Sequence, residues 1–357
     1  MKAIKFFAIS AMAAAMITSC SSEDELSQSN YPSDNIIRVT AGVNNAKTRA
    51  DVKYSPMDKP FSLTIVNRNT ESSELAKKYT YVDKVFSKSS SGDWTCSETL
   101  LWQKATIPVD IVAFAPAQEN KFSGVCDNAG NIKPIAYSVA DDQSTKSDNN
   151  DLLYNYTPSF VPGGTNLDEK GRLSIQFNHA FCMIDIVVTL GTEFNKPKVL
   201  DDSPIVKVTL GGTKIEANVD VTKAATGSTE GSTEGSTEGS TTTTTASVVT
   251  ASETAAATDI TTTKGTFDKA ANAEANAKSY FSCIAIPQTV AANTFKVSLM
   301  TAGKRYEWTS DKKITLQSGY RYTLELTMGN DVVLLKGGSI TATPWTEITG
   351  LKPLETE

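Results

Sequence analysis

The sequence predicts an all-β protein built of β-sandwiches, and three features of the 357-residue chain support this prediction. Apolar and polar side chains alternate one by one over many short segments, which is typical of strands with one buried face. The glycine pairs at 211–212 and 337–338 separate such segments as turns do. Long amphipathic helices are not indicated, since only residues 72–78 and the alanine-rich residues 268–278 favour helix, and only a short one.

The alternating segments run through the whole chain. The first of them, residues 36–43, places four apolar side chains on one face: Ile37, Val39, Ala41 and Val43. The same pattern returns in residues 61–65, 173–177, 184–190, 206–210, 215–219, 295–299 and 320–328. Each of these segments is expected to be a half-buried strand.

The length of the chain suggests two domains. Residues 141–164 are rich in Asp, Asn, Pro and Gly, a composition typical of loops. We therefore expect an N-terminal sandwich over residues 36–170 and a C-terminal sandwich over residues 171–357.

The N-terminus carries an export signal. A basic start precedes a short apolar segment that ends in Ile17-Thr18-Ser19-Cys20, so residues 1–19 are predicted to be a signal peptide. The last four residues resemble a bacterial lipobox, in which the Cys20 thiol is acylated and anchors the mature chain in a membrane. Residues 20–35 begin with an acidic cluster and are predicted to be a disordered tether. An ordinary cleaved signal with a chance cysteine is the alternative.

The segment after residue 226 repeats Gly-Ser-Thr-Glu and then runs into threonines. It offers no apolar side chains for a core, so we predict a low-complexity surface loop at about 224–262. Its role is either a solvated spacer or a site of glycosylation on its hydroxyls.

The net charge of −6 argues against a nucleic-acid partner, because such proteins carry a basic surface. Four cysteines remain after lipidation, and the sequence does not choose between free thiols and a disulfide, nor among the pairings: Cys96, Cys126, Cys182 and Cys283. Their wide spacing, without a CxxC pair, is unlike that of a zinc site.

The single histidine, His179, excludes most nucleophile–base schemes and is expected to be structural. The acidic loop at 141–151 lacks the glycine that a calcium loop needs at its sixth position. Tryptophans could stack on sugar faces, but core packing accounts for most of them. We therefore expect no catalytic residue, no metal site and no cofactor.

Arg49 follows the first strand within Lys47-Thr48-Arg49-Ala50 and is a candidate cleavage site. A cut between Arg49 and Ala50 would separate the anchor and residues 36–43 from the rest of the chain. A sandwich that loses a strand has an apolar groove with unpaired N–H and C=O groups, which can accept a strand from another chain. The alternative is an ordinary turn residue between two strands.

Residues 331–345 form the candidate donor strand. Four apolar side chains could share one face there: Val333, Leu335, Ile340 and Ala342. The alternative is a strand paired within its own domain, and Trp345 is expected to be packed rather than to bind a glycan.

Taken in order, several segments resemble the fimbrillin-like proteins of the Bacteroidales, the subunits of type V pili. The matching segments are residues 37–50 with Thr48-Arg49-Ala50, 98–116, 151–154, 173–186 with Phe177-Asn178-His179-Ala180, 319–324 and 340–345. The resemblance implies two tandem transthyretin-like Greek-key β-sandwich domains in an outer-membrane lipoprotein. It also implies removal of the first strand by an arginine-specific protease, which here falls after Arg49, and strand addition from other pilus subunits.

The sequence therefore predicts a non-enzymatic structural or adhesive pilus subunit at the cell surface. The alternative is a surface lipoprotein that does not polymerise and binds a glycan or a host ligand. A surface hydrolase is disfavoured because no acid–base pair is indicated, although two carboxylates can meet without a motif.

Overall fold

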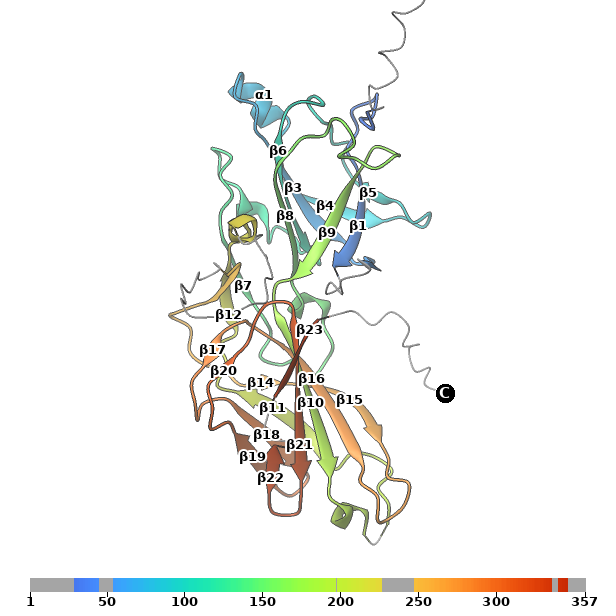
Figure 1. Cartoon of the computed structure of the whole chain (residues 1–357), viewed down its shortest axis with the longest axis vertical. Coiled ribbons are helices and arrows are strands. Elements are labelled where there is room, and N and C mark those ends of the chain that lie inside the picture. Colours follow the sequence, from blue (N-terminus) through green and yellow to red (C-terminus); the bar gives the residue numbers. More distant parts are fainter. Residues whose placement is uncertain (1–28, 45–53, 197, 227–246, 336–339, 346–357) are drawn as a thin grey trace, which may run out of the picture.

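The computed structural model describes residues 29–44, 54–196, 198–226, 247–335 and 340–345. Within these ranges the chain is almost entirely β, which confirms the predicted fold class (Figure 1). One α-helix, α1 (Ser73–Lys78), and four 3₁₀ helices interrupt the strands of the described part: η1 (Ser123–Val125), η2 (Asp148–Asn150), η3 (Thr192–Asn195) and η4 (Val221–Thr226).

The N-terminal half forms one eight-stranded sheet in the order β2-β1-β9-β8-β6-β3-β4-β5. Its strands are β1 (Arg38–Asn44), β2 (Tyr54–Pro56), β3 (Phe61–Asn67), β4 (Tyr81–Lys88), β5 (Trp94–Cys96), β6 (Val109–Ala115), β8 (Leu153–Phe160) and β9 (Arg172–His179). The sheet folds over one core, because the ring of Phe61 on β3 meets the ring of Phe177 on β9 at 5.4 Å.

The C-terminal half packs a six-stranded sheet on a four-stranded sheet. The first has the order β15-β16-β10-β21-β22 with β23 also on β21, and the second has the order β14-β11-β18-β19. Their strands are β10 (Cys182–Leu190), β11 (Ile205–Gly211), β14 (Ile260–Thr261), β15 (Thr263–Asp268), β16 (Lys278–Ala285), β18 (Lys296–Thr301), β19 (Arg305–Thr309), β21 (Tyr320–Met328), β22 (Val333–Leu335) and β23 (Thr341–Pro344).

A small sheet ties the two halves together. In it β12 (Glu216–Val219) pairs with β13 (Val249–Ala251) on one side and with β7 (Ile135–Ser138) from the N-terminal half on the other. The remaining pair joins β17 (Thr289–Val290) to β20 (Ile314–Thr315). The halves lie end to end along the long axis of the molecule, with the N-terminal half at the top of Figure 1.

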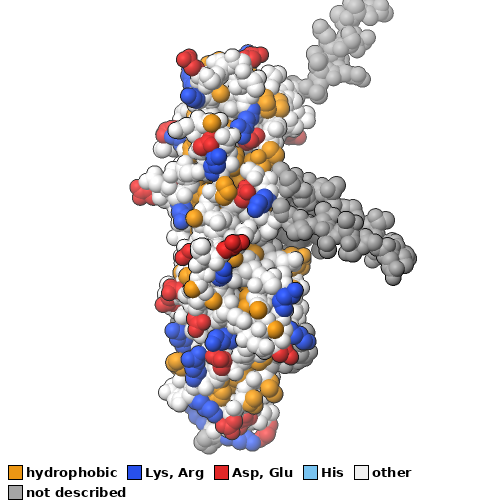
Figure 2. Space-filling model, turned by 90° about the vertical axis from the view of Figure 1, so that its left-hand side faces the viewer, with side chains coloured by type: hydrophobic (Ala, Val, Ile, Leu, Met, Phe, Trp, Pro, Cys, Tyr) orange, Lys and Arg blue, Asp and Glu red, His pale blue; other side chains and the backbone are white. Residues whose placement is uncertain are grey.

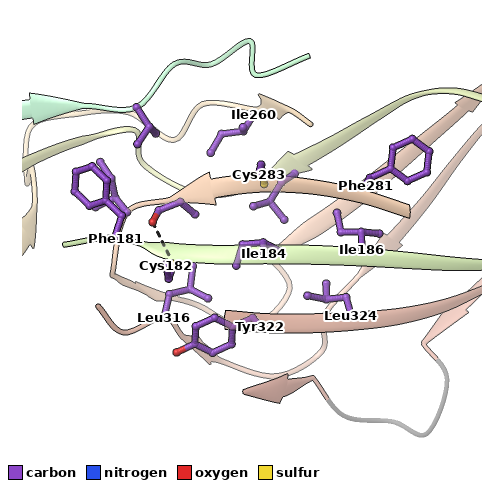
Figure 3. Packing of buried hydrophobic residues seen from close by; sticks show 14 of the residues in the cluster. Phe181, Cys182, Ile184, Ile186, Ile260, Phe281, Cys283, Leu316, Tyr322 and Leu324 are labelled. Atoms are coloured by element: carbon purple, nitrogen blue, oxygen red, sulfur yellow. Dashed lines mark hydrogen bonds between the residues drawn. The ribbon is translucent and has the colours of Figure 1, made fainter. Parts of the chain in front are cut away.

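Two hydrophobic clusters correspond to the two halves. One holds side chains of β1, β3, β6 and β9, including Phe61 and Phe177. The other is built around β10 and β21 and also takes in Phe122 and Tyr137 from the N-terminal half. Figure 3 shows how Ile184, Ile186 and Leu324 of this second cluster lie among side chains from neighbouring strands.

The helix α1 lies within predicted residues 72–78, and the side chain of Ser72 caps it by accepting the Leu75 N–H. The short helix predicted over residues 268–278 is wrong, because β15 ends at Asp268 and β16 starts at Lys278. Between them, Asn272 accepts the Glu274 N–H with its side chain, a local bond that favours a turn over a helix.

Two other findings concern the predicted domain boundary and the predicted low-complexity loop. The strand β9 follows the predicted boundary at residues 170 and 171, yet it lies between β1 and β8 in the N-terminal sheet. Within the predicted loop of 224–262, residues 247–262 contribute the strands β13 and β14, because Val248, Val249 and Ile260 are apolar and buried. The Gly-Ser-Thr-Glu repeat lies outside the described residues.

No helix in the described part of the chain is long and apolar enough to cross a membrane.

Candidate functional site

The candidate for the exchanged strand is β1, which lies near one edge of the N-terminal sheet. It runs parallel to β9 from the pair Arg38–Arg172 to the pair Val43–Phe177. Ile37, Val39 and Val43 are 5%, 4% and 2% exposed, whereas Ala41 is half-buried. The alternating sequence thus places three of the four named side chains in the core.

The other side of β1 is only partly paired. Near its end, Gly42, Val43 and Asn44 pair with the three residues of β2. Just before its start, the Ile37 N–H donates to the Leu100 carbonyl at 2.9 Å, and Ile36 forms an isolated bridge to Leu101. The intervening stretch has no paired strand on this side among the described residues. We call these two contacts, at Leu100 and Leu101, braces. They could not be predicted from the sequence, because no local pattern identifies the residues that pair with the edge of a strand.

A cavity of about 460 Å³ lies beside this half-open edge. Ile37, directly before β1, and Val39 on β1 line one side of it, and Trp94 and Cys96 line the other side from β5. The two ends of the eight-stranded sheet therefore approach each other here without pairing.

Removing β1 would uncover a groove with an aromatic floor. The ring of Phe61 packs on the rings of Phe86, Trp94 and Phe177 at centroid distances of 5.5, 4.9 and 5.4 Å. The edge of β9 would then present its unpaired N–H and C=O groups beside these rings. This arrangement can accept an extended segment that carries apolar side chains at alternate positions.

The candidate cleavage and lipidation residues lie outside the described residues: Cys20, Arg49 and Ala50. In the chain, Arg49 and Ala50 stand between the end of β1 at Asn44 and the start of β2 at Tyr54. A cut there would leave β1 joined to the sheet by non-covalent contacts alone.

The candidate donor segment is paired with its own domain. Val333 and Leu335 lie on β22, opposite Met328 and Leu326 of β21. Further along, Ala342 on β23 lies opposite Tyr322 of the same strand. Both short strands therefore lie on the outer edge of β21.

The side chains of the donor segment do not form one buried face. Val333 is buried and Ile340 is half-buried, but every side chain of β23, including Ala342, is exposed. Within the described residues the segment pairs in its own domain, as in the alternative given for it from the sequence.

Trp345 follows β23 and is packed, as expected. Its ring stacks on the His179 ring with a centroid distance of 3.8 Å and an interplanar angle of 11°. Nδ1 of His179 lies 2.9 Å from Oδ1 of Asp151, which orients the ring. The sequence indicated each side chain as structural, but no signal in it indicates that they meet.

The four cysteines of the described chain are free thiols. Cys182 and Cys283 are buried on neighbouring strands, and the Cys182 thiol donates to the Ala285 carbonyl (Figure 3). Burial raises the pKa of both buried thiols well above the usual range. Burial likewise raises the pKa of Cys126.

Few features of the described surface indicate a catalytic or metal-binding site. Among the described residues, no group of three or more His, Cys, Asp or Glu side chains could hold a metal ion. A cavity of about 940 Å³ includes Arg68, whose guanidinium pairs with Asp110 and donates to the Gly130 carbonyl. Figure 2 shows basic and acidic side chains interspersed on the face in view, so that face has no large field of one sign.

Comparison with known proteins agrees with this architecture. The sequence profile of a family described as fimbrillin-like matches residues 48–345. The chain belongs to the fimbrillin-like family. This confirms the resemblance found in the sequence.

Solved structures similar to this fimbrillin-like chain include two proteins from Bacteroides species. A proposed cell adhesion protein from Bacteroides ovatus aligns with a TM-score of 0.56 and 13% identity, covering 87% of this chain and 98% of that one. Another from Bacteroides uniformis aligns with a TM-score of 0.50 and 14% identity, covering 88% and 100%. At such identities the similarity shows the fold alone. A search among curated proteins found no significant match.

Proposed function

We propose that this fimbrillin-like chain is a structural subunit of a cell-surface pilus, assembled by strand exchange after proteolysis. Membership in the family and the incomplete pairing of β1 on its side away from β9 support this function. The chain would be exported, acylated on Cys20 and held at the outer membrane, with no catalytic activity of its own. Its partners would be an arginine-specific protease and other pilus subunits.

The observation that carries the proposal is the pairing of β1. Its apolar side chains fill the core, yet among the described residues its side away from β9 is held by the short β2 and, just before its start, by braces at Leu100 and Leu101. Each buried side chain of this size contributes about 1.5–3 kcal/mol. While β1 remains covalently attached these contacts are enough to keep it in place. Once it is cut, a strand of similar pattern from another subunit can replace it.

The direct test is limited cleavage of the lipid-free mature chain with an arginine-specific protease. We expect a cut after Arg49, identified by mass, followed by a ladder of oligomers that persists in detergent on a gel. The matched controls are Arg49→Ala, which should remain monomeric, and Arg38→Ala, which should still assemble. A chain that is fully cut after Arg49 yet stays monomeric contradicts strand exchange.

The donor strand is tested separately with a reversible lock. Thr341 and Thr323 are paired residues of the antiparallel strands β23 and β21, a placement suited to a disulfide. The double variant Thr341→Cys/Thr323→Cys, oxidised before cleavage, should form no ladder, and reduction should restore it. The oxidised single variant Thr341→Cys is the control. Ladders from the oxidised double variant would show that this segment is not donated.

A second function is favoured by one observation. The candidate donor segment already pairs with β21 in its own domain, as expected of a subunit that does not polymerise. Such a lipoprotein would keep β1 and bind a glycan or host ligand on its surface. A cleaved chain that remains monomeric and retains β1 in size-exclusion chromatography supports this second function.

A further inference from the structure

The last residues of β9 contact both β1 and Trp345, the residue after β23. In the proposed function, β1 and the segment that contains β23 are the two parts of the chain that leave their places. On one side, Phe177 pairs with Val43 of β1, and Asn44 donates from Nδ2 to Oδ1 of Asn178 at 2.9 Å. On the other side, the next residue, His179, stacks on Trp345. Three consecutive residues thus join the first strand to the last one.

The contact at His179 is the firmer of the two. His179 is 4% exposed and Trp345 is 8% exposed, so the stack is closed to water. The Trp345 N–H also donates to the Gly319 carbonyl at 2.6 Å, and the Gly319 N–H donates to the Phe181 carbonyl at 2.9 Å. Backbone and ring together therefore tie Trp345 to the segment that follows β9.

The rest of the last strand is held weakly. All four side chains of β23 are exposed, and the strand pairs only with β21. Just before it, Ile340 is half-buried against the C-terminal cluster. Trp345 is therefore the largest apolar anchor of residues 340–345, and an aromatic stack of this kind adds to the free energy of simple burial.

We propose that the stack of Trp345 on His179 is a latch that keeps the last strand on its own subunit, and that departure of β1 loosens it. This inference rests on the proposed function, because it concerns how one subunit is prepared for exchange. With β1 gone, Asn178 loses its bond to Asn44 and Phe177 loses its paired neighbour. The end of β9 is then paired only with β8, where His179 and Asn178 lie opposite Leu153 and Tyr154. The His179 ring is less firmly placed, so the stack weakens and β23 opens more often.

The test measures opening of residues 341–345 by hydrogen exchange in the full, uncleaved chain. Trp345→Ala should speed exchange there at least tenfold, a factor that corresponds to about 1.4 kcal/mol. Trp308→Ala is the matched control, since it removes a half-buried tryptophan of the same half that lies on β19 and leaves His179 untouched. Exchange that is unchanged by Trp345→Ala, or equally fast in Trp308→Ala, overturns the latch. If Trp345→Ala does not fold, Trp345→Leu keeps apolar bulk without the stack and should still speed exchange.

The coupling to β1 is tested in the same assay. Asn44→Ala should speed exchange of residues 341–345 about threefold, and the effect should vanish when Trp345 is already alanine. Cleavage after Arg49 should give a larger increase that is likewise absent from the Trp345→Ala chain. Independent, additive effects of the two substitutions would overturn the coupling. Because the substitutions are compared in uncleaved chains, their outcomes stand apart from the oligomer ladders that follow cleavage, and either result can fail without the other.

Discussion

The strands β1 and β10 hold equivalent places in the two halves, yet they are secured very differently. Each is the first strand of its half, and each runs parallel to the last long strand of that half: β1 to β9, and β10 to β21. However, β10 also pairs along its length with β16, from Cys182 opposite Ala285 to Thr189 opposite Lys278. In the described part of the chain, the corresponding side of β1 has the short β2 and the braces at Leu100 and Leu101.

The comparison shows that alternation of apolar and polar residues does not determine whether a strand can be removed from its sheet. Both strands alternate apolar and polar residues, and both bury their apolar face. Removing β10 would break two ladders in the middle of a six-stranded sheet. Removing β1 would break one long ladder with β9, a three-residue ladder with β2 and a few braces near the border of its sheet. The first strand is therefore suited to exchange, and its counterpart is suited to permanent structure.

The largest difference is expected from the same substitution made on β10 and at the residue directly before β1. Ile186→Ala on β10 should lower the free energy of unfolding by about 4 kcal/mol, because the side chain is fully buried between paired strands. Ile37→Ala should cost about 2 kcal/mol, since Ile37 borders a cavity at the strand edge. Denaturant unfolding measures both values. Equal losses would contradict the view that β1 is the less secured strand.

A smaller difference is expected in thiol reactivity beside the two strands. Cys96 borders the cavity next to β1, whereas Cys283 is buried next to β10, where burial raises the pKa of its thiol. Because the thiolate is the reactive form, Cys283 should react with an alkylating reagent at pH 8 at least about 100-fold more slowly than Cys96. Mass spectrometry of the labelled peptides measures both rates, and labelling in denaturant is the control. Comparable rates in the native chain would show that β10 and its neighbours open as readily as the edge of β1.

The smallest difference concerns one ion pair near each strand. Asp185 on β10 pairs with Arg321 on β21 and is mostly buried, so Arg321→Met should cost about 1 kcal/mol. Asp34, just before β1, pairs with Arg38 in full contact with solvent, and Asp34→Asn should shift Tm by less than about 1 °C.

The pH dependence of the exposed pair has a definite sign. The hydrogen bond from Arg38 lowers the pKa of Asp34 to about 2. Its small contribution is therefore present above the ordinary carboxyl pKa of about 4 and is lost as the pH falls through about 2. Thermal unfolding of wild type and Asp34→Asn at pH 6 and pH 2 should show the two Tm values converge at the lower pH. A difference that grows towards pH 2 would contradict this assignment.

Much of the fold could be predicted because its signal is local. Alternation at Ile37, Val39 and Val43 indicated a half-buried strand, and the structure buries all three. At β23 the same alternation does not correspond to burial, and Ala342 is exposed, since alternation records which residues share a face and not whether anything covers that face. Local reasoning failed at residues 268–278, where alanine content favoured helix and the local bond at Asn272 favoured a turn.

The candidate site could be predicted only in part. The position of Arg49 after the first strand is visible in the chain itself, and so is the apolar face of that strand. The braces at Leu100 and the bond between Asn44 and Asn178 join residues far apart in the sequence, without any motif. The same holds for the ring of Trp345 on His179, which are separated by the whole of the C-terminal half.

By itself, the sequence determined that this chain is all-β, that it belongs with the fimbrillin-like proteins and that its first strand has one apolar face. These properties follow from side-chain order along short segments, which local backbone geometry converts directly into buried and exposed faces. Only the tertiary structure decided that β1 lies near a sheet edge while β10 lies between two partners, and that β1 and Trp345, the residue after the last strand, both contact the end of β9. Pairing between distant strands depends on how whole sheets pack, and no stretch of residues contains that information alone.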